Sequence, residues 1–163
     1  MKTIRNWKKV FESDLDYIVA ELKEAVTAPA VLILSGPVGA GKTTFTKRFV
    51  KGIAKETPAP ARAHEFEVVS PTYGLIHESG NLAHADFYRI KDREEILHLE
   101  IELYLENKDY FLVEWGMPFL PTLRKEVGEH FKFYQVEIII NDSNSEKATG
   151  PSESSRDFFL QEL

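Results

Sequence analysis

The sequence of 163 residues contains no cysteine. Disulfides, thiolate metal sites, iron–sulfur clusters and cysteine nucleophiles are therefore excluded, and a reducing compartment is favoured. No stretch approaches the 18 or more apolar residues of a membrane-spanning helix, and the basic segment 1–9 is followed by no apolar run of signal-peptide length. We therefore expect a cytoplasmic protein with no membrane segment.

An excess of positive charge is also missing. Lys and Arg number 20 against 26 Asp and Glu, which gives a net charge of −6. This balance argues against a broad basic face that grips nucleic acid, although it leaves room for a local phosphate site. At about 100 to 200 residues per domain, we expect residues 1–163 to form one domain. With 43% hydrophobic residues, that domain has enough apolar surface for a core.

The hydrophobic pattern predicts an α/β fold. Two four-residue apolar runs, at 31–34 and 110–113, are typical of strands buried on both faces. Amphipathic helices are expected on either side of the first run, one with Ser13 as its N-cap and one whose apolar stripe is Phe45, Phe49, Val50 and Ile53. Further elements are expected at 92–106 (helix), 121–127 (helix), 134–140 (strand) and 158–160 (edge strand).

Segments 75–78 and 82–86 are separated by Ser79-Gly80-Asn81, which predicts a β-hairpin in an otherwise α/β pattern. Before the hairpin, a proline-containing connection ends in a short strand at Val68-Val69. The polar segment 141–155, rich in Ser and Glu, predicts a mobile loop.

The stretch from Gly36 to Thr43 fits the P-loop pattern of Gly, four residues, Gly, Lys and Ser or Thr. Its glycines let backbone N–H groups curl around phosphates, and the following helix directs its positive end at the same charge. Lys42 would reach the β- and γ-phosphates and act in catalysis, and the Thr43 hydroxyl would bind Mg²⁺. The expected nucleotide-binding residues are Gly36, Pro37, Val38, Gly39, Ala40, Gly41, Lys42, Thr43 and Thr44.

A P-loop enzyme also needs an acid at the end of a neighbouring strand to hold Mg²⁺, directly or through water. Glu114 ends the apolar run 110–113, whose carboxyl end should face the ligand crevice, and Asp86 ends a weaker alternating strand. We assign Glu114 to the metal and Asp86 to the attacking water or to an ordered shell behind the metal. A helix cap or a solvated strand end is the alternative for either carboxylate.

Three other features invite a functional interpretation. Ser70-Pro71-Thr72-Tyr73 offers hydroxyls on a Pro-restricted segment, which suits either a loop that senses the γ-phosphate or an ordinary β-turn. Arg89 could pair with phosphate or with Asp86, or simply lie at the surface. His77 and His84, in the two hairpin strands, have no third residue to complete a metal site.

Five ordered segments between Val31 and Trp115 resemble the TsaE (YjeE) ATPases of tRNA threonylcarbamoyladenosine biosynthesis. They read SGPVGAGKTTFTKRF, VSPTYGLIHE, HADFYRI, EEILHLEIELYL and LVEW. The resemblance implies a three-layer P-loop NTPase-type fold with a mixed central sheet that includes the hairpin. It also implies an ATP-hydrolysing subunit that resets a complex of two partners, TsaB and TsaD, and meets tRNA only indirectly.

Carried over by position, the resemblance gives Thr43 and Glu114 to Mg²⁺, Asp86 to the γ-phosphate and residues 70–73 to a switch loop. The sequence departs from the family at 11–13, where a Thr near the nucleotide base is usual, and Arg156 would correspond to a late family Arg. Two other functions remain open at this point: a small-molecule P-loop kinase, and a nucleotide-gated binding module without useful turnover.

Overall fold

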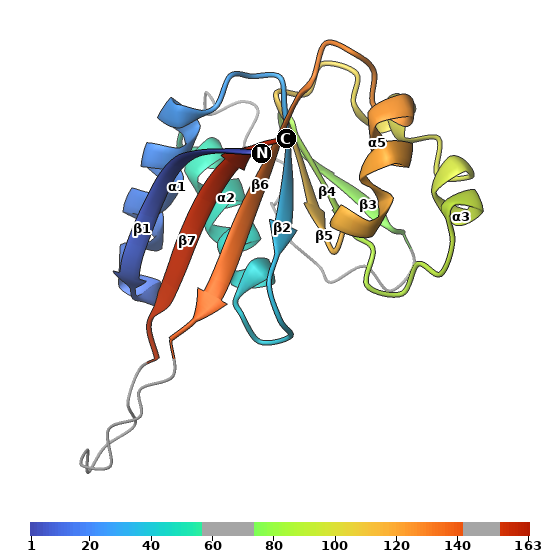
Figure 1. Ribbon diagram of the computed structural model, residues 1–163. Coiled ribbons are helices and arrows are strands. Elements are labelled where there is room, and N and C mark those ends of the chain that lie inside the picture. The colour runs from blue at the N-terminus through green and yellow to red at the C-terminus, as the bar shows by residue number, and fades with distance from the viewer. Residues whose placement is uncertain (57–73, 142–153) are drawn as a thin grey trace.

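The computed structural model describes residues 1–56, 74–141 and 154–163. In this part of the chain, seven strands form one mixed sheet in the order β1-β7-β6-β2-β5-β4-β3 (Figure 1). The strands are β1 Lys2–Val10, β2 Ala30–Ser35, β3 Ile76–Ser79, β4 Leu82–Asp86, β5 Tyr110–Glu114, β6 Lys132–Ile140 and β7 Arg156–Glu162. The helices are η1 Glu12–Asp14, α1 Leu15–Ala25, α2 Lys42–Glu56, α3 Arg93–Leu97, α4 Ile101–Tyr104, η3 Met117–Phe119 and α5 Leu120–Glu126.

The centre of the sheet is parallel. Strand β2 pairs with β5 on one side and β6 on the other, and β4 pairs with β5 in the same direction. Both apolar runs of the sequence lie here, and Val31–Leu34 and Phe111–Val113 are fully buried. The carboxyl ends of β2, β4 and β5 therefore meet at one edge of the sheet. The antiparallel pairing of β3 with β4 confirms the predicted hairpin.

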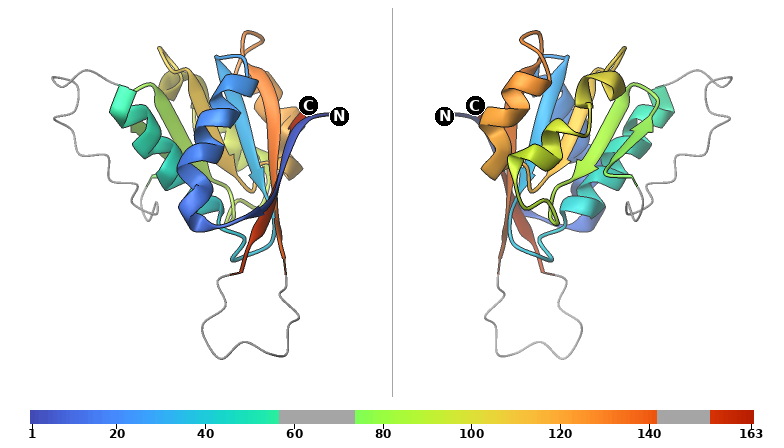
Figure 2. Two further views of the ribbon diagram at one scale, coloured as in Figure 1. Left: turned by 90° about the vertical axis from the view of Figure 1, so that its left-hand side faces the viewer. Right: turned by 90° about the vertical axis from the view of Figure 1, so that its right-hand side faces the viewer.

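Helices cover the sheet from both faces, which confirms the three-layer α/β fold. Helices α1 and α2 lie against one face, and α3, α4 and α5 lie against the other (Figures 1 and 2). Two separate core clusters correspond to these two faces: Phe45 and Phe49 of α2 pack in the first, and Ile96 and Phe111 pack in the second. The two termini lie side by side, at the end of the molecule away from the loop between β2 and α2 (Figure 1).

The helix predicted over 92–106 is wrong, because the structure has the two short helices α3 and α4 instead. Glu100 separates them with a left-handed φ of 49°, a conformation that ends a helix. The break allows Ile96 and Ile101 to reach the same core, where both are buried. Leu103, which the single helix would have buried, is 67% exposed.

The amino-terminal strand β1 was not expected from the sequence. Only Trp7 and Val10 are buried in it, so its alternation is weak. Because β1 pairs with β7, the predicted edge strand at 158–160 is an interior strand between β1 and β6. Ser13 is not an N-cap but lies within η1, whose first turn is closed by Asp14 accepting the N–H of Phe11 at 2.9 Å.

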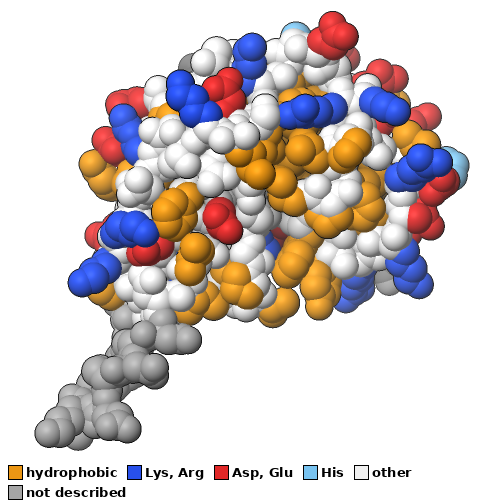
Figure 3. Space-filling model, in the orientation of Figure 1, with side chains coloured by type: hydrophobic (Ala, Val, Ile, Leu, Met, Phe, Trp, Pro, Cys, Tyr) orange, Lys and Arg blue, Asp and Glu red, His pale blue; other side chains and the backbone are white. Residues whose placement is uncertain are grey.

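The face of β1 and β7 that turns away from α1 and α2 has no helix over it among the described residues (Figure 1). Hydrophobic and charged side chains are mixed on the side of the molecule shown in Figure 3, and Ile4 and Ile139 are exposed.

None of the described helices is long and apolar enough to cross a membrane. The predictions at Val68-Val69, at 70–73 and for most of 141–155 fall outside the described residues.

Candidate functional site

The P-loop connects the buried strand β2 to α2, and Lys42 is the first residue of that helix. The Lys42 ammonium donates to the carbonyl oxygens of Gly36 and Pro37, each at 2.8 Å, and lies 4.1 Å from the centroid of the Trp115 ring. Burial lowers the pKa of Lys42, and the nearby carboxylates of Glu114 and Asp86 oppose that effect. The loop thus holds a desolvated cation whose partners are backbone oxygens and an aromatic ring.

The glycines of the loop meet different surroundings. Gly36 has a φ of 144°, and a Cβ there would lie 2.5 Å from the carbonyl oxygen of Ile138 in β6. Gly39 has a φ of 80°, but a Cβ there would meet nothing within 4 Å. The first glycine is thus required by close packing on the neighbouring strand, whereas the second borders open space.

Glu114 ends β5 and is only 2% exposed. Its Oε2 accepts a hydrogen bond from the Thr43 hydroxyl at 3.0 Å. Its Oε1 accepts from the Thr46 hydroxyl at 3.4 Å and lies 3.1 Å from Nε2 of His84. The structure therefore brings together the two residues, Thr43 and Glu114, that the sequence assigned to Mg²⁺.

Asp86 ends β4 directly beside Glu114 in the strand register. Its Oδ1 accepts the backbone N–H of Tyr88 at 2.9 Å, which fixes the carboxylate, and the Tyr88 ring packs on Trp115 with centroids 5.2 Å apart. Both carboxylates line a cavity of 410 Å³, which we call the acidic pocket. It is lined by Val38, Gly39, Gly41, Lys42, Thr43, Thr44, Asp86, Tyr88, Glu114 and Trp115.

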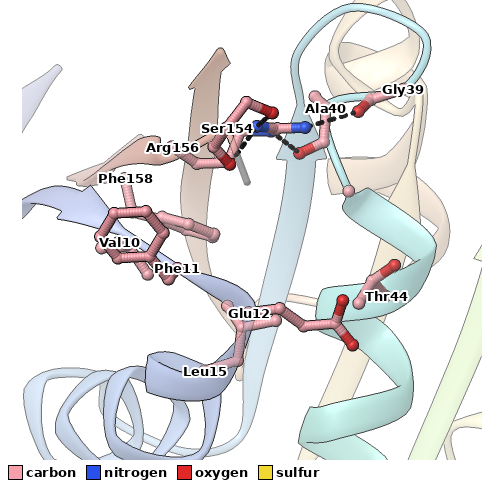
Figure 4. Close-up of a pocket in the computed structure, with 11 residues that line it drawn as sticks. Val10, Phe11, Glu12, Leu15, Gly39, Ala40, Thr44, Ser154, Arg156 and Phe158 are labelled. Carbon is pink, nitrogen blue, oxygen red and sulfur yellow. Dashed lines mark hydrogen bonds between the residues drawn. The ribbon is translucent and has the colours of Figure 1, made fainter. Parts of the chain in front are cut away.

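A second cavity, of 240 Å³, lies on the other side of the P-loop (Figure 4). This aromatic pocket is lined by Val10, Phe11, Glu12, Leu15, Gly39, Ala40, Gly41, Thr44, Ser154, Arg156 and Phe158. Arg156 donates from Nε to the carbonyl of Ala40 at 3.1 Å and from Nη2 to that of Gly39 at 3.4 Å. Gly39, Gly41 and Thr44 border both pockets, so the P-loop separates them.

Sequence reasoning missed several of these contacts. Thr46 lies one helical turn after Thr43, and His84 lies two residues before Asp86. Periodicity therefore places them on the same faces as these two predicted site residues, and the fold then brings both to Glu114. The aromatic pocket offered no such signal, because Phe11 and Phe158 are 147 residues apart in the sequence (158 − 11).

Two weaker predictions also have an outcome. Arg89 is exposed and lines neither pocket. His77 and His84 face each other across the hairpin, but no group of three or more His, Cys, Asp or Glu able to hold a metal exists among the described residues.

A P-loop between a buried parallel strand and a helix, with acids at the ends of two neighbouring strands, defines a P-loop NTPase-type protein. Residues 11–148 match the family model for the threonylcarbamoyl adenosine biosynthesis protein TsaE. The chain belongs to the TsaE family.

Relatives named tRNA threonylcarbamoyladenosine biosynthesis protein TsaE support this assignment. The Nostoc protein is 33% identical over 74% of this chain and 76% of its own length, and the Bacillus subtilis protein is 37% identical over 71% and 68%. A crystal structure of YdiB from Bacillus subtilis covers 95% of this chain and 84% of its own, with a TM-score of 0.53 and 26% identity.

Proposed function

We propose that this chain binds ATP with Mg²⁺ at the P-loop and hydrolyses it as a subunit of the bacterial machinery that makes tRNA N6-threonylcarbamoyladenosine. The contact between the Thr43 hydroxyl and the Glu114 carboxylate, beside Lys42, carries the proposal. These are the groups that P-loop NTPases use for the metal and the phosphates.

The donor set fits Mg²⁺, which prefers oxygen ligands and keeps several of its waters. Thr43 and Glu114 would hold the ion, and Asp86 would reach it through water. When bound, the ion would supply positive charge that neutralises the charge developing on the transferred phosphoryl group. Open space beside Gly39, at the start of the 15-residue helix α2, suits the phosphates themselves.

In this mechanism Lys42 exchanges the carbonyls of Gly36 and Pro37 for phosphate oxygens, which brings a desolvated positive charge to the transferred group. Asp86, fixed by the N–H of Tyr88, orients the attacking water. No arginine among the described residues lines the acidic pocket. We therefore expect slow hydrolysis by the isolated chain, with a partner completing the site.

The aromatic pocket is our proposed site for the adenine base. Phe11 is 40% exposed and offers aromatic surface to a purine, whereas Phe158, only 2% exposed, belongs to the core that borders the pocket. Glu12 extends toward Thr44 across the opening (Figure 4). The Glu12 carboxylate can accept hydrogen bonds from amino or hydroxyl groups of a nucleoside. ATP would then span both pockets, with its phosphates at the P-loop between them.

We propose TsaB and TsaD as the partners, with ATP turnover resetting their complex. The names of the relatives support the pathway, since they place those proteins in tRNA threonylcarbamoyladenosine biosynthesis. The net charge of −6 favours contact with tRNA only through the partners.

The first test is calorimetric titration of the protein and of Lys42→Ala with Mg²⁺ and ADP. Loss of the ammonium should raise the dissociation constant of ADP by about 100-fold, because charged hydrogen bonds to phosphate are lost. Lys125→Ala, at an exposed position of α5, is the matched control and should bind as the parent does. An unchanged dissociation constant in Lys42→Ala would refute the phosphate assignment.

The second test is co-purification with TsaB and TsaD in the presence of ATP, ADP or neither, together with phosphate release. Nucleotide-dependent association and phosphate release that the partners accelerate are expected. Fast release that the partners do not change would contradict the proposed role. Transfer of phosphate to a metabolite instead of water would point to a kinase.

A further inference from the structure

His84 lies in the interior of β4, opposite Leu112 of β5, with its side chain on the face that α2 covers. The residue is 4% exposed, so its imidazole is enclosed by the core. Its Nε2 lies 3.1 Å from Oε1 of Glu114, and the other ring nitrogen, Nδ1, is buried with no partner among the described residues. Within the described part of the chain, the contact to Glu114 is therefore the one hydrogen bond of this side chain.

Glu114 needs such a partner because a buried carboxylate is costly unless its oxygens accept hydrogen bonds. The two oxygens have separate roles in the structure. Oε2 faces the P-loop and accepts from Thr43, whereas Oε1 faces the interior and meets His84 and Thr46. A carboxylate only accepts, so Nε2 of His84 carries the proton of the shared hydrogen bond.

We propose that His84 is a positioning residue, which holds Oε1 of Glu114 from behind so that Oε2 faces Thr43 and the metal. The inference rests on the proposed function, because it assumes that Glu114 binds Mg²⁺. The shorter distance and the enclosed ring make His84 the main support, and Thr46, at 3.4 Å, the lesser one. Groups that orient a metal ligand change metal affinity by about 10- to 100-fold when removed.

The chain offers a matched control on the same hairpin. His77 faces His84 directly across β3 and β4, and its Nε2 is also buried with no hydrogen-bond partner in the segments that the structure describes. Only His84, however, contacts Glu114. If losing any buried histidine of the hairpin weakened Mg²⁺ binding, substitutions at 77 and 84 would have the same effect. If the contact with Glu114 matters, only the substitution at 84 should weaken it.

The experiment measures binding of a fluorescent ADP analogue as Mg²⁺ is titrated, and its affinity in EDTA, where no metal contributes. In His84→Leu, the Mg²⁺ concentration at half-saturation should rise at least tenfold while the affinity in EDTA stays unchanged. His84→Gln places an amide N–H near the position of Nε2 and should restore most of the Mg²⁺ dependence. His84→Asn places its amide near Nδ1 and should not, and His77→Leu should behave as the parent.

If His84→Leu does not fold, the comparison of His84→Gln with His84→Asn tests the positioning role. Both replacements are polar amides, and thermal unfolding checks that the two variants are equally stable. The positioning role would be overturned if His84→Gln and His84→Asn had the same Mg²⁺ dependence. It would also be overturned if these variants lost as much nucleotide affinity in EDTA as in Mg²⁺. Glu114→Gln separates this failure from that of the proposed function. If Glu114→Gln leaves the Mg²⁺ dependence of binding unchanged, the proposed metal site itself is refuted. If Glu114→Gln raises the Mg²⁺ concentration at half-saturation but the His84 variants do not, only the role of His84 is refuted.

Discussion

The parallel half of the sheet and its antiparallel extension contribute to the site in different ways. In the parallel half, β2, β4 and β5 end at the same edge and deliver the P-loop, Asp86 and Glu114. The antiparallel strands β1 and β7 instead bring Arg156 and Phe158 to the far side of the P-loop. The parallel half follows the general rule for open α/β sheets, whereas the antiparallel extension reaches the P-loop from its other side.

This contrast divides the proposed nucleotide site into two regions. The parallel half supplies fixed oxygen atoms and a desolvated cation, which suit phosphate and metal. The extension supplies aromatic rings and a guanidinium that contacts the P-loop carbonyls of Gly39 and Ala40. Variants in each half should therefore change stability, phosphate affinity and base affinity to different degrees.

The largest expected effect lies in the parallel half, at Gly36. Gly36→Ala should lower the free energy of unfolding by about 2–4 kcal/mol, because its Cβ would lie 2.5 Å from the Ile138 carbonyl at a strained φ. Gly39→Ala is the matched control: it has a positive φ but no close neighbour, and should cost about 1 kcal/mol. Urea unfolding measures both, and equal losses would show that β6 does not constrain the loop.

The parallel half was also the part that the sequence predicted best. Strands β2 and β5 are buried on both faces, so their positions appear as continuous apolar runs, and Glu114 follows the second run directly. The sequence predicted both Asp86 and Glu114 at strand ends, and the pairing of β4 with β5 in the folded sheet places them side by side. Local chemistry and sheet topology are sufficient for this region.

The rest depends on contacts that no local pattern contains. The break at Glu100 follows from packing Ile96 and Ile101 into one core, although the local pattern favoured a continuous helix. Strand β1 buries few residues, because one face of the extension lacks a covering helix among the described residues. Arg156 reaches the P-loop from 116 residues away, so only the folded sheet reveals its contact.

Arg156 gives the next largest effect and tests how far the extension acts on the P-loop. Arg156→Ala removes the hydrogen bonds to the carbonyls of Gly39 and Ala40. The affinities for ATP and for inorganic tripolyphosphate should both fall by about tenfold. Arg156→Lys keeps the charge but not the paired geometry and should recover only part of the affinity. Calorimetric titration with the two ligands provides the measurement.

The control for Arg156 is Arg93→Ala, whose side chain is 74% exposed in α3 and lines neither pocket. It should leave both affinities unchanged. If Arg156→Ala weakened ATP but not tripolyphosphate, the guanidinium would serve the base alone, and the extension would have no part in holding the P-loop.

The smallest effect is expected at Phe11, which lines the aromatic pocket and is 40% exposed. Stacking of a base on an aromatic ring contributes about 1–3 kcal/mol, and the exposure of this ring favours the low end. Phe11→Ala should therefore lower the affinity for ATP by about fivefold and leave the affinity for tripolyphosphate unchanged, whereas Phe11→Tyr should keep the ATP affinity. Tyr17→Ala removes a ring that is 61% exposed and outside both pockets, and serves as the control. Because tripolyphosphate has no base, an equal loss for both ligands in Phe11→Ala would contradict the division of the site between the two halves of the sheet.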